Sequence, residues 1–288
     1  MTTDVHTATR TAISVRGLSK AYGDLRAVDG IDLEVRPGEV FALLGPNGAG
    51  KTTTVEILEG YRRRDAGDVS VLGADPERAD AAWRARIGIV LQTAPAAEEL
   101  TVQEVLRHFA TFYPAPGAVD EVVAAVGLEE KRRTRIRQLS GGQRRRLDVA
   151  LGILGRPELL FLDEPTTGFD PEARRDFWEL IRTLAAEGTT IVLTTHYLDE
   201  AEYLADRVGV ITGGRLVAVD SPHRLGHRET SGSVVRWSEG GVRREVVTAT
   251  PSATVRDLSA RLGGEVPELT VSRPTLEDVY LRLIGENR

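Results

Sequence analysis

The sequence predicts an α/β protein with an antiparallel β lead-in, a helical lobe and a small α+β appendage at its carboxyl end. Apolar runs such as Val40–Leu44 and Leu159–Leu162 are typical of strands buried on both faces of a parallel sheet. A glycine-rich loop follows the first run, and a segment with helical character, Thr54–Gly60, follows the loop. From Pro95 to Leu154 the apolar residues recur at helical spacing, which indicates a separate helical lobe.

Residues 12–44 form the predicted lead-in. A short apolar segment, Ile13–Val15, precedes a strand whose apolar residues alternate, and a Pro37–Gly38 turn separates this strand from Val40. Tyr22 lies before the loop Gly23–Asp24. Considered by itself, Tyr22 suits either of two roles: an aromatic that stacks on a nucleotide base, or a core aromatic. The alternating residues are Ile31, Leu33 and Val35.

The loop after Val40–Leu44 has the spacing G-x-x-x-x-G-K-[ST]. In this pattern backbone N–H groups surround phosphates, Lys51 reaches the β and γ oxygens, and the Thr52 hydroxyl holds Mg²⁺. The helix that follows directs its free N–H groups at the same anion. The alternative is an ordinary glycine-rich turn between a strand and a helix. The predicted nucleotide-binding residues here are Gly45, Pro46, Asn47, Gly48, Ala49, Gly50, Lys51, Thr52 and Thr53.

Further strands are predicted at residues 68–73 and at Ile87–Leu91, which ends at Gln92. A glutamine at a strand end is usually a surface residue. The helical lobe ends in the pentapeptide Leu139–Gln143, which precedes an arginine-rich helix. A serine and two glycines at a helix start suit either a second anion site or an N-cap with loop glycines. The arginines at 132, 133, 135, 137 and 144–146 are interpreted as a solvated or phosphate-adjacent face.

The buried run Leu159–Leu162 ends in two acids, Asp163 and Glu164. Ligands of open α/β sheets lie at the carboxyl ends of the strands. Because side chains alternate along a strand, we expect one acid to suit Mg²⁺ and the other to orient and deprotonate a water. The next predicted strand, Thr189–Thr195, ends at His196, which suits a hydrogen bond to a γ-phosphate or a structural role.

Composition limits the function classes. The chain has 288 residues, no cysteine and a net charge of -6, which argue against disulfides, cysteine-based chemistry and bulk nucleic-acid affinity. We expect neither a membrane-spanning segment nor a secretory signal. A hairpin at Gly213–Gly214 closes the first domain, predicted at 1–222 with the helical lobe at about 93–155. A second, α+β domain is predicted at 223–288, with a strand near Val266–Val271.

The ordered motifs between Ile13 and Val219 resemble the ATPase subunit of an ATP-binding cassette (ABC) transporter, which is a P-loop NTPase. The resemblance implies that Tyr22 stacks on adenine, that Gln92 is the Q-loop residue and a metal ligand, and that Leu139–Gln143 is the signature. It also implies that Asp163 and Glu164 are the Walker B pair, with Asp163 and Thr52 on Mg²⁺. Phe169 stands where the family usually has leucine, so altered packing with retained function is expected. The implied signature residues are Ser140, Gly141, Gly142 and Gln143, the D-loop acid is Asp170, and the catalytic residues are Glu164, His196 and Lys51.

The tail Pro274–Leu281 resembles the daunorubicin-resistance branch of exporter ATPases. The resemblance implies a homodimer that holds two ATP molecules with Mg²⁺ head to tail, so that one chain's signature closes over ATP on the other. It implies ATP hydrolysis coupled to efflux of a drug-like or lipid-like substrate through a separately encoded permease. The chain would then be a peripheral protein at the cytoplasmic side of the membrane, and no nucleic-acid partner is expected. The alternative is a soluble ABC protein acting on ribosomes or nucleic acid, which usually has two cassettes or a coiled-coil insertion.

Overall fold

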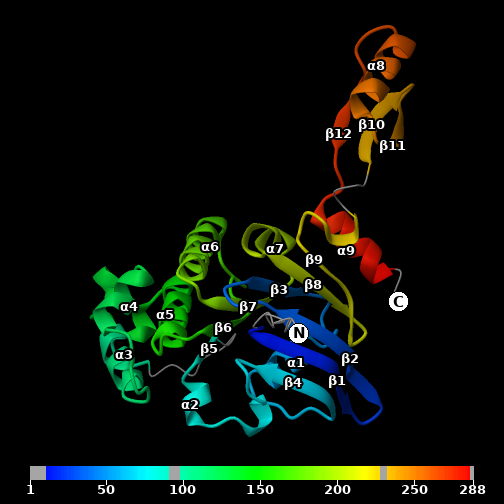
Figure 1. Cartoon of the computed structure of the whole chain (residues 1–288). Helices are drawn as coiled ribbons and strands as arrows, with labels where there is room; N and C mark the ends of the chain where they lie inside the picture. The colour runs from blue at the N-terminus through cyan, green and yellow to red at the C-terminus, as the bar shows by residue number, and fades with distance from the viewer. Residues whose placement is uncertain (1–10, 91–97, 228–231, 286–288) are drawn as a thin grey trace, which may run out of the picture. The chain divides into compact units, whose positions relative to one another are not determined.

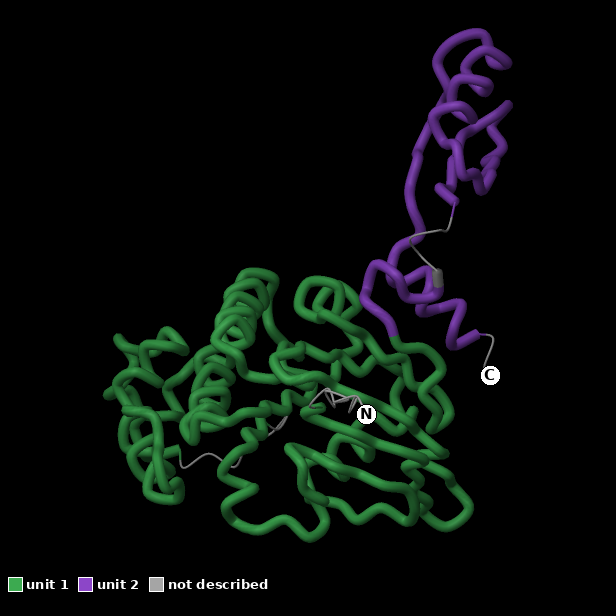
Figure 2. The backbone as a smooth tube through the Cα atoms, viewed as in Figure 1, with its two compact units in different colours: residues 1–219 green, residues 220–288 purple. Residues whose placement is uncertain are grey.

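The computed structural model describes residues 11–90, 98–227 and 232–285. The chain divides into two compact units, Met1–Val219 and Asp220–Arg288, shown in green and purple in Figure 2. The boundary predicted from the sequence followed residue 222.

The first unit begins with an antiparallel sheet of three strands in the order β2-β1-β4. In β1 (Ile13–Tyr22), Ile13 pairs with Val35 of β2 (Leu25–Val35) and with Val71 of β4 (Ala66–Val71). The predicted antiparallel lead-in is confirmed. Strand β1 is longer than the predicted segment Ile13–Val15. The register shifts between Val15 and Leu18, where Gly17 has a φ of 59°, and pairing with β2 resumes after this irregularity.

The second sheet has six strands in the order β5-β6-β7-β3-β8-β9. The pairs β5·β6, β6·β7, β3·β7 and β3·β8 are parallel, so the carboxyl ends of these strands meet at one edge. Strands β8 and β9 are joined by Gly213 and Gly214, both at positive φ, as in a two-residue hairpin. The strands are β3 (Val40–Leu44), β5 (Ile87–Val90), β6 (Leu159–Asp163), β7 (Thr190–Thr195), β8 (Arg207–Thr212) and β9 (Arg215–Asp220).

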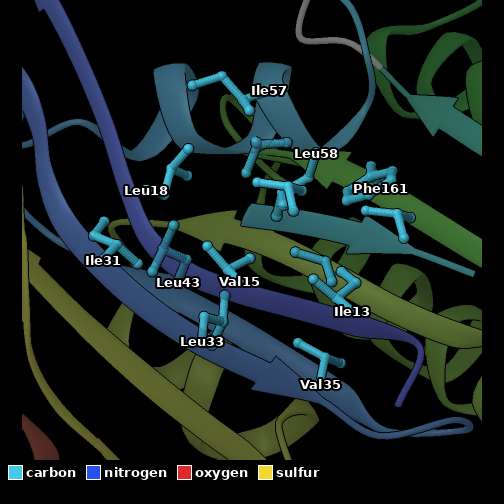
Figure 3. Close-up of a cluster of buried hydrophobic side chains, with 14 of the residues drawn as sticks. Ile13, Val15, Leu18, Ile31, Leu33, Val35, Leu43, Ile57, Leu58 and Phe161 are labelled. Carbon is cyan, nitrogen blue, oxygen red and sulfur yellow. The ribbon is translucent and has the colours of Figure 1, made fainter. Parts of the chain in front are cut away.

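The main core lies where the two sheets meet helix α1 (Lys51–Leu58). Figure 3 shows side chains of β1 and β2, such as Val15 and Leu33, gathered with Leu43 of β3, Leu58 of α1 and Phe161 of β6. Each large aliphatic side chain buried here contributes roughly 1.5–3 kcal/mol relative to exposure. The core therefore holds the start of α1 and the end of β3 in a fixed relation.

Three helices of residues 98–155 contact one another and form the helical lobe (Figure 1). Helix α3 starts with a capping box of Thr101 and Glu104 and buries Val102, Val105 and Leu106. No helix in the described ranges is both long and apolar enough to cross a lipid bilayer. The α-helices of this unit after α1 are α2 (Ala81–Arg84), α3 (Val102–Ala110), α4 (Val119–Ala125), α5 (Gly141–Ile153), α6 (Pro171–Ala186) and α7 (Leu198–Leu204). Short 3₁₀ turns are η1 (Pro76–Arg78), η2 (Glu129–Lys131) and η3 (Ile136–Gln138).

The second unit contains an antiparallel sheet in the order β11-β10-β12, with a small core of Val235, Trp237, Leu258 and Val266. A strand over 266–271 was predicted, but β12 begins only at Thr270, because Pro267 lacks an N–H group and Glu268 has a φ of 52°. The elements are β10 (Ser233–Glu239), β11 (Val242–Thr248), α8 (Pro251–Leu262), β12 (Thr270–Ser272), α9 (Leu276–Gly285) and the turn η4 (Leu225–His227).

Candidate active site

The loop between β3 and α1 can be built only with glycine at two positions. A Cβ atom at Gly45 would lie 2.3 Å from the Ile211 carbonyl oxygen, and one at Gly50 would lie 2.2 Å from that of Ala27. Gly50 also has a φ of 104°, which side chains rarely allow. The loop backbone is thus pressed against β8 and β2, which fixes its curvature.

Lys51 lies inside this loop. Its ammonium donates hydrogen bonds to the carbonyls of Gly45, at 2.7 Å, and Pro46, at 3.2 Å, and the residue is 6% exposed. Burial lowers the pKa of Lys51, whereas Glu164 and Asp163 raise it. These two carboxylates therefore lie near enough to influence the loop lysine.

The start of α1 is open to an anion. Among the residues that the structure describes, no side chain caps α1 at Gly50, which leaves the first-turn N–H groups available. Thr52, Asn47 and Gly48 are exposed around this helix end. The geometry is that of a phosphate-binding loop, with the Thr52 hydroxyl accessible at its rim.

The two acids of β6 lie beside β7. Asp163 accepts a hydrogen bond from the Thr194 hydroxyl, and the Glu164 N–H is 3.1 Å from both the carbonyl and the hydroxyl oxygen of Thr194. Glu164 has a φ of 43°, a left-handed conformation that costs a side-chain-bearing residue energy and often marks a functional site. Strand β6 ends at Asp163, and the backbone turns at Glu164, so the carboxylates of these two residues do not share one orientation.

His196 and Glu164 are neighbours. His196 Nδ1 lies 3.4 Å from Glu164 Oε1, and the Thr167 hydroxyl donates to Glu164 Oε2 at 3.3 Å. The Glu164 side chain is 20% exposed and the imidazole 42% exposed, so water reaches both. A carboxylate held between two partners at the open edge of a sheet can orient and deprotonate a water.

The predicted signature forms the start of α5. Ser140 accepts from the Gln143 N–H at 3.3 Å, and the Gln143 side chain accepts from the Ser140 N–H at 3.1 Å, which is a capping box. Gly141 is exposed, and a Cβ atom there would meet no atom of the described residues within 4 Å apart from its own helix turn. The N-cap role of Ser140 is present, and the surface over Gly141 is open to a second molecule.

Asp170 acts as the N-cap of α6, accepting from the N–H groups of Glu172 and Ala173. The adjacent Phe169 packs edge to face on Phe177, with ring centroids 5.7 Å apart. Phe169 stands at the position where leucine is usual, and its ring packs through this contact with Phe177.

Tyr22 is 41% exposed, so its interpretation as a core aromatic is wrong. Lys20 Nζ lies 5.6 Å and Arg62 Cζ 5.4 Å from the ring centroid, which gives the ring a cationic surrounding. Its adenine-stacking role stays a prediction. Gln92 lies outside the described residues, so its assignment also stays a prediction.

Arg145 corrects the interpretation of residues 144–146 as a solvated or phosphate-adjacent face. It is 7% exposed, and its guanidinium donates to the carbonyls of Pro165 and Asp163, each at 2.9 Å. The helical spacing held a signal for this burial, because Arg145 lies in line with the buried Val149 and Gly152 on α5. Arg145 thus ties the signature helix to the loop after β6.

Glu200 is a second residue that the motifs did not reveal. It is fully buried and accepts hydrogen bonds from the Thr166 hydroxyl at 2.8 Å and from the Trp178 indole at 3.1 Å. Burial raises the pKa of its carboxyl group. Glu200 therefore links α7, which follows His196, to the loop that follows Glu164.

Comparison with known families matches residues 28–167 to the ABC transporter family. The chain is 41% identical to the daunorubicin resistance ATP-binding protein DrrA3 of Streptomyces coeruleorubidus, over 96% of this chain and 97% of that protein. It is 40% identical to the Nod factor export ATP-binding protein I of Burkholderia orbicola, over 95% of this chain and 97% of that protein.

Solved structures share the fold. The ATP binding subunit of an ABC transporter superimposes with a TM-score of 0.70 at 24% identity, covering 95% of this chain and 99% of that chain. An ATP-binding cassette in a dimeric post-hydrolysis state with ADP and Pi gives a TM-score of 0.65 at 23% identity, covering 73% and 98%.

The phosphate loop and the acids beside it define a P-loop ATPase. With the relatives described above, the chain belongs to the ABC transporter family as an ATP-binding subunit, an ATP-hydrolysing cassette coupled to transport. The predicted fold class and the resemblance to the daunorubicin-resistance branch are confirmed.

The residues present fit ATP with Mg²⁺. Within 11–90, 98–227 and 232–285, no group of three or more His, Cys, Asp or Glu side chains is arranged to hold a metal ion. Mg²⁺ needs no such group, since it is commonly bound through one or two carboxylates, water and substrate phosphates. The Thr52 hydroxyl and the Asp163 carboxylate supply protein oxygens of the required kind.

Proposed function

We propose that this chain powers the export of a drug-like or lipid-like molecule through a separately encoded membrane permease. The observation that carries the proposal is the convergence of Lys51, Asp163, Glu164 and His196 around one phosphate loop. Relatives similar over nearly the whole chain are named for daunorubicin resistance and Nod factor export, which supports an exporter. The chain would act as a peripheral protein on the cytoplasmic side of the membrane.

Each site residue has a role in ATP hydrolysis. Lys51 and the first-turn N–H groups of α1 bind the β- and γ-phosphates. Thr52 and Asp163, with Gln92, would hold Mg²⁺, which would supply positive charge to neutralise the charge developing on the phosphate. Glu164 orients and deprotonates the attacking water, and His196 donates a hydrogen bond to the γ-phosphate. Tyr22 stacks on the adenine.

The ATP sites are shared between two copies of the chain. Residues Ser140–Gln143 stand at the N-terminus of α5, with Gly141 exposed and its surroundings open. A second chain arranged head to tail would present this helix start to ATP on the first, so that a homodimer encloses two ATP molecules. Asp170 lies beside the same interface in this arrangement.

Reconstitution tests the proposed function. The chain is combined in lipid vesicles with its proposed permease, a polytopic membrane protein without a cassette of its own, and ATP-dependent accumulation of daunorubicin or of a fluorescent lipid is followed. We expect accumulation that needs both proteins and is lost with Glu164→Gln. ATP hydrolysis that the membrane protein does not alter, without accumulation of either probe, would contradict an exporter role.

A further inference from the structure

The ring of Tyr22 is exposed at the end of a strand. Tyr22 is the last residue of β1, pairs there with Leu25 of β2, and is 41% exposed. An exposed side chain samples several rotamers, and fixing it in one of them costs conformational free energy when a ligand binds. A ring that serves as a stacking surface therefore binds its ligand more tightly if neighbouring groups already hold it in place.

Arg62 approaches this ring from the segment that follows α1. The guanidinium carbon of Arg62, Cζ, lies 5.4 Å from the centroid of the Tyr22 ring, within the range of a cation–π contact. The Arg62 side chain is 34% exposed, so the surrounding water screens this contact only in part. The cation and the ring come from different elements of the first unit, and the contact therefore joins these elements.

Glu56 fixes the guanidinium of Arg62. The Nε atom of Arg62 donates to Glu56 Oε2 at 2.5 Å, and the backbone N–H of Arg62 donates to the Glu56 carbonyl at 3.0 Å. Glu56 belongs to α1, whose side chains Val55 and Leu58 are buried in the main core. The guanidinium is therefore attached to the same helix that begins at the phosphate loop with Lys51.

Asp65, in the same segment, fixes the backbone of the strand end. Its carboxylate accepts from Lys20 Nζ and from the Ala21 N–H, each at 2.7 Å, and its own N–H donates to the Ser19 carbonyl at 2.9 Å. The Lys20 ammonium, which lies 5.6 Å from the centroid of the Tyr22 ring, is engaged in this ion pair. The segment after α1 therefore holds both the backbone of the strand end and the exposed ring.

We propose that Arg62 is a positioning residue for the nucleotide base: held by Glu56, its guanidinium keeps the Tyr22 ring in the orientation in which the base stacks. The proposal rests on the proposed function, since the base stacks on Tyr22 there. The base stacks on the surface of the ring that Arg62 leaves open. Because Glu56 lies on α1, the base and the phosphates are held from one helix, and the distance between their two subsites is fixed.

Steady-state ATP hydrolysis by the full-length chain tests this role. Arg62→Met keeps a long side chain and removes the guanidinium. We expect the KM for ATP to rise about fivefold, with kcat within about twofold of wild type, because a contact made equally in the ground and transition states changes KM alone. Arg62→Lys keeps the cation and should recover part of the loss.

The neighbouring Arg63 provides a matched control. Its side chain is 85% exposed, and its Nε atom lies 3.6 Å from Glu77 Oε1. Arg63→Met makes the same chemical change one residue further along the chain, at an exposed ion pair. This variant should leave both KM and kcat at the wild-type values.

Inorganic tripolyphosphate separates positioning of the base from general damage to α1, since it carries three phosphates and no base. Its inhibition constant against ATP hydrolysis should be the same in wild type and in Arg62→Met. Inhibition weakened as much as the KM for ATP would overturn the proposal, because Arg62 would then act on the phosphate loop. A KM for ATP in Arg62→Met that equals the wild-type value, or lies below it, would also overturn the proposal.

A double-mutant cycle identifies the ring through which Arg62 acts. Tyr22→Leu should raise the KM for ATP, and the addition of Arg62→Met should raise it no further. Additive effects of the two substitutions would overturn the positioning role and leave the stacking role of Tyr22 intact. An unchanged KM in Tyr22→Leu would instead contradict the stacking role, and the positioning role with it. The exporter proposal is judged separately, by ATP-dependent accumulation in vesicles.

Discussion

Glu164 is positioned by its backbone as well as by its partners. Glu164→Gln keeps the shape of the side chain and its place beside His196 and Thr167, but removes the basic oxygen. We expect ATP binding to persist while turnover falls by roughly 10² to 10⁴, the usual range for loss of a positioned general base. Single-turnover hydrolysis measures the effect, with the exposed Glu172→Gln as control. Turnover near that of wild type would remove Glu164 from this role.

Glu59 should make stability depend on pH. It lies directly after α1 and is 8% exposed, and burial raises its pKa from an ordinary 4.5 to about 8, so the folded chain keeps a proton that the unfolded chain releases. The stabilisation is complete below pH 4.5 and is lost as the pH rises to 8. We expect wild type to lose unfolding free energy relative to Glu59→Gln across this window, by at most a few kcal/mol.

Urea unfolding at pH 5 and pH 8 measures this loss. Wild type and variant are compared at each pH because burial also raises the pKa of Asp148 to about 6, and this carboxyl group contributes to the pH dependence of both proteins. Curves for the two proteins that stay parallel over the window would show that Glu59 is not protonated in the folded chain.

At the scale of elements, the contact between α5 and the end of β6 depends on Arg145. Arg145→Ala leaves the buried carbonyls of Pro165 and Asp163 without this donor, and such losses cost about 1–3 kcal/mol each. We expect an unfolding free energy lower by about 2–5 kcal/mol, measured by urea unfolding. Arg137→Ala, at an exposed pair with Glu99, should change it by less than about 1 kcal/mol. A cost for Arg145→Ala as small as this control would refute the linkage.

The same elements show what could be read from the sequence. The loop from Gly45 to Thr53 and the acids after β6 were predictable, because glycine spacing and buried apolar runs are local patterns. The left-handed backbone of Glu164 was not predicted, because its hydrogen-bond partner Thr194 is distant in sequence. The helical spacing held a signal for the burial of Arg145, but its carbonyl partner Pro165 could not be identified from a local pattern. Strand β12 was overestimated because its apolar residues continue past the point where backbone pairing stops.

At the scale of the whole molecule, the division at Val219 predicts a separable cassette. Every predicted nucleotide contact precedes Gly213–Gly214, and each unit has its own core. We expect a chain truncated after Ser221 to unfold cooperatively and to bind ATP within about threefold of the full chain. Thermal unfolding and nucleotide titration measure this. An insoluble product would show that the second unit is needed for the first to fold.

The most direct measurement asks whether two chains share each ATP site. Lys51→Ala removes the loop ammonium, and Gly141→Asp puts a carboxylate at the open start of α5, where a Cβ meets no described residue beyond its own helix turn within 4 Å. Both variants also carry Glu164→Gln to prevent turnover, and ATP occlusion is measured for each alone and for the mixture. Random pairing makes about half of the dimers mixed, each with one intact site of two, so about a quarter of the sites should occlude ATP in the mixture. Occlusion no greater in the mixture than in either variant alone, with mixed dimers demonstrated, would contradict shared sites.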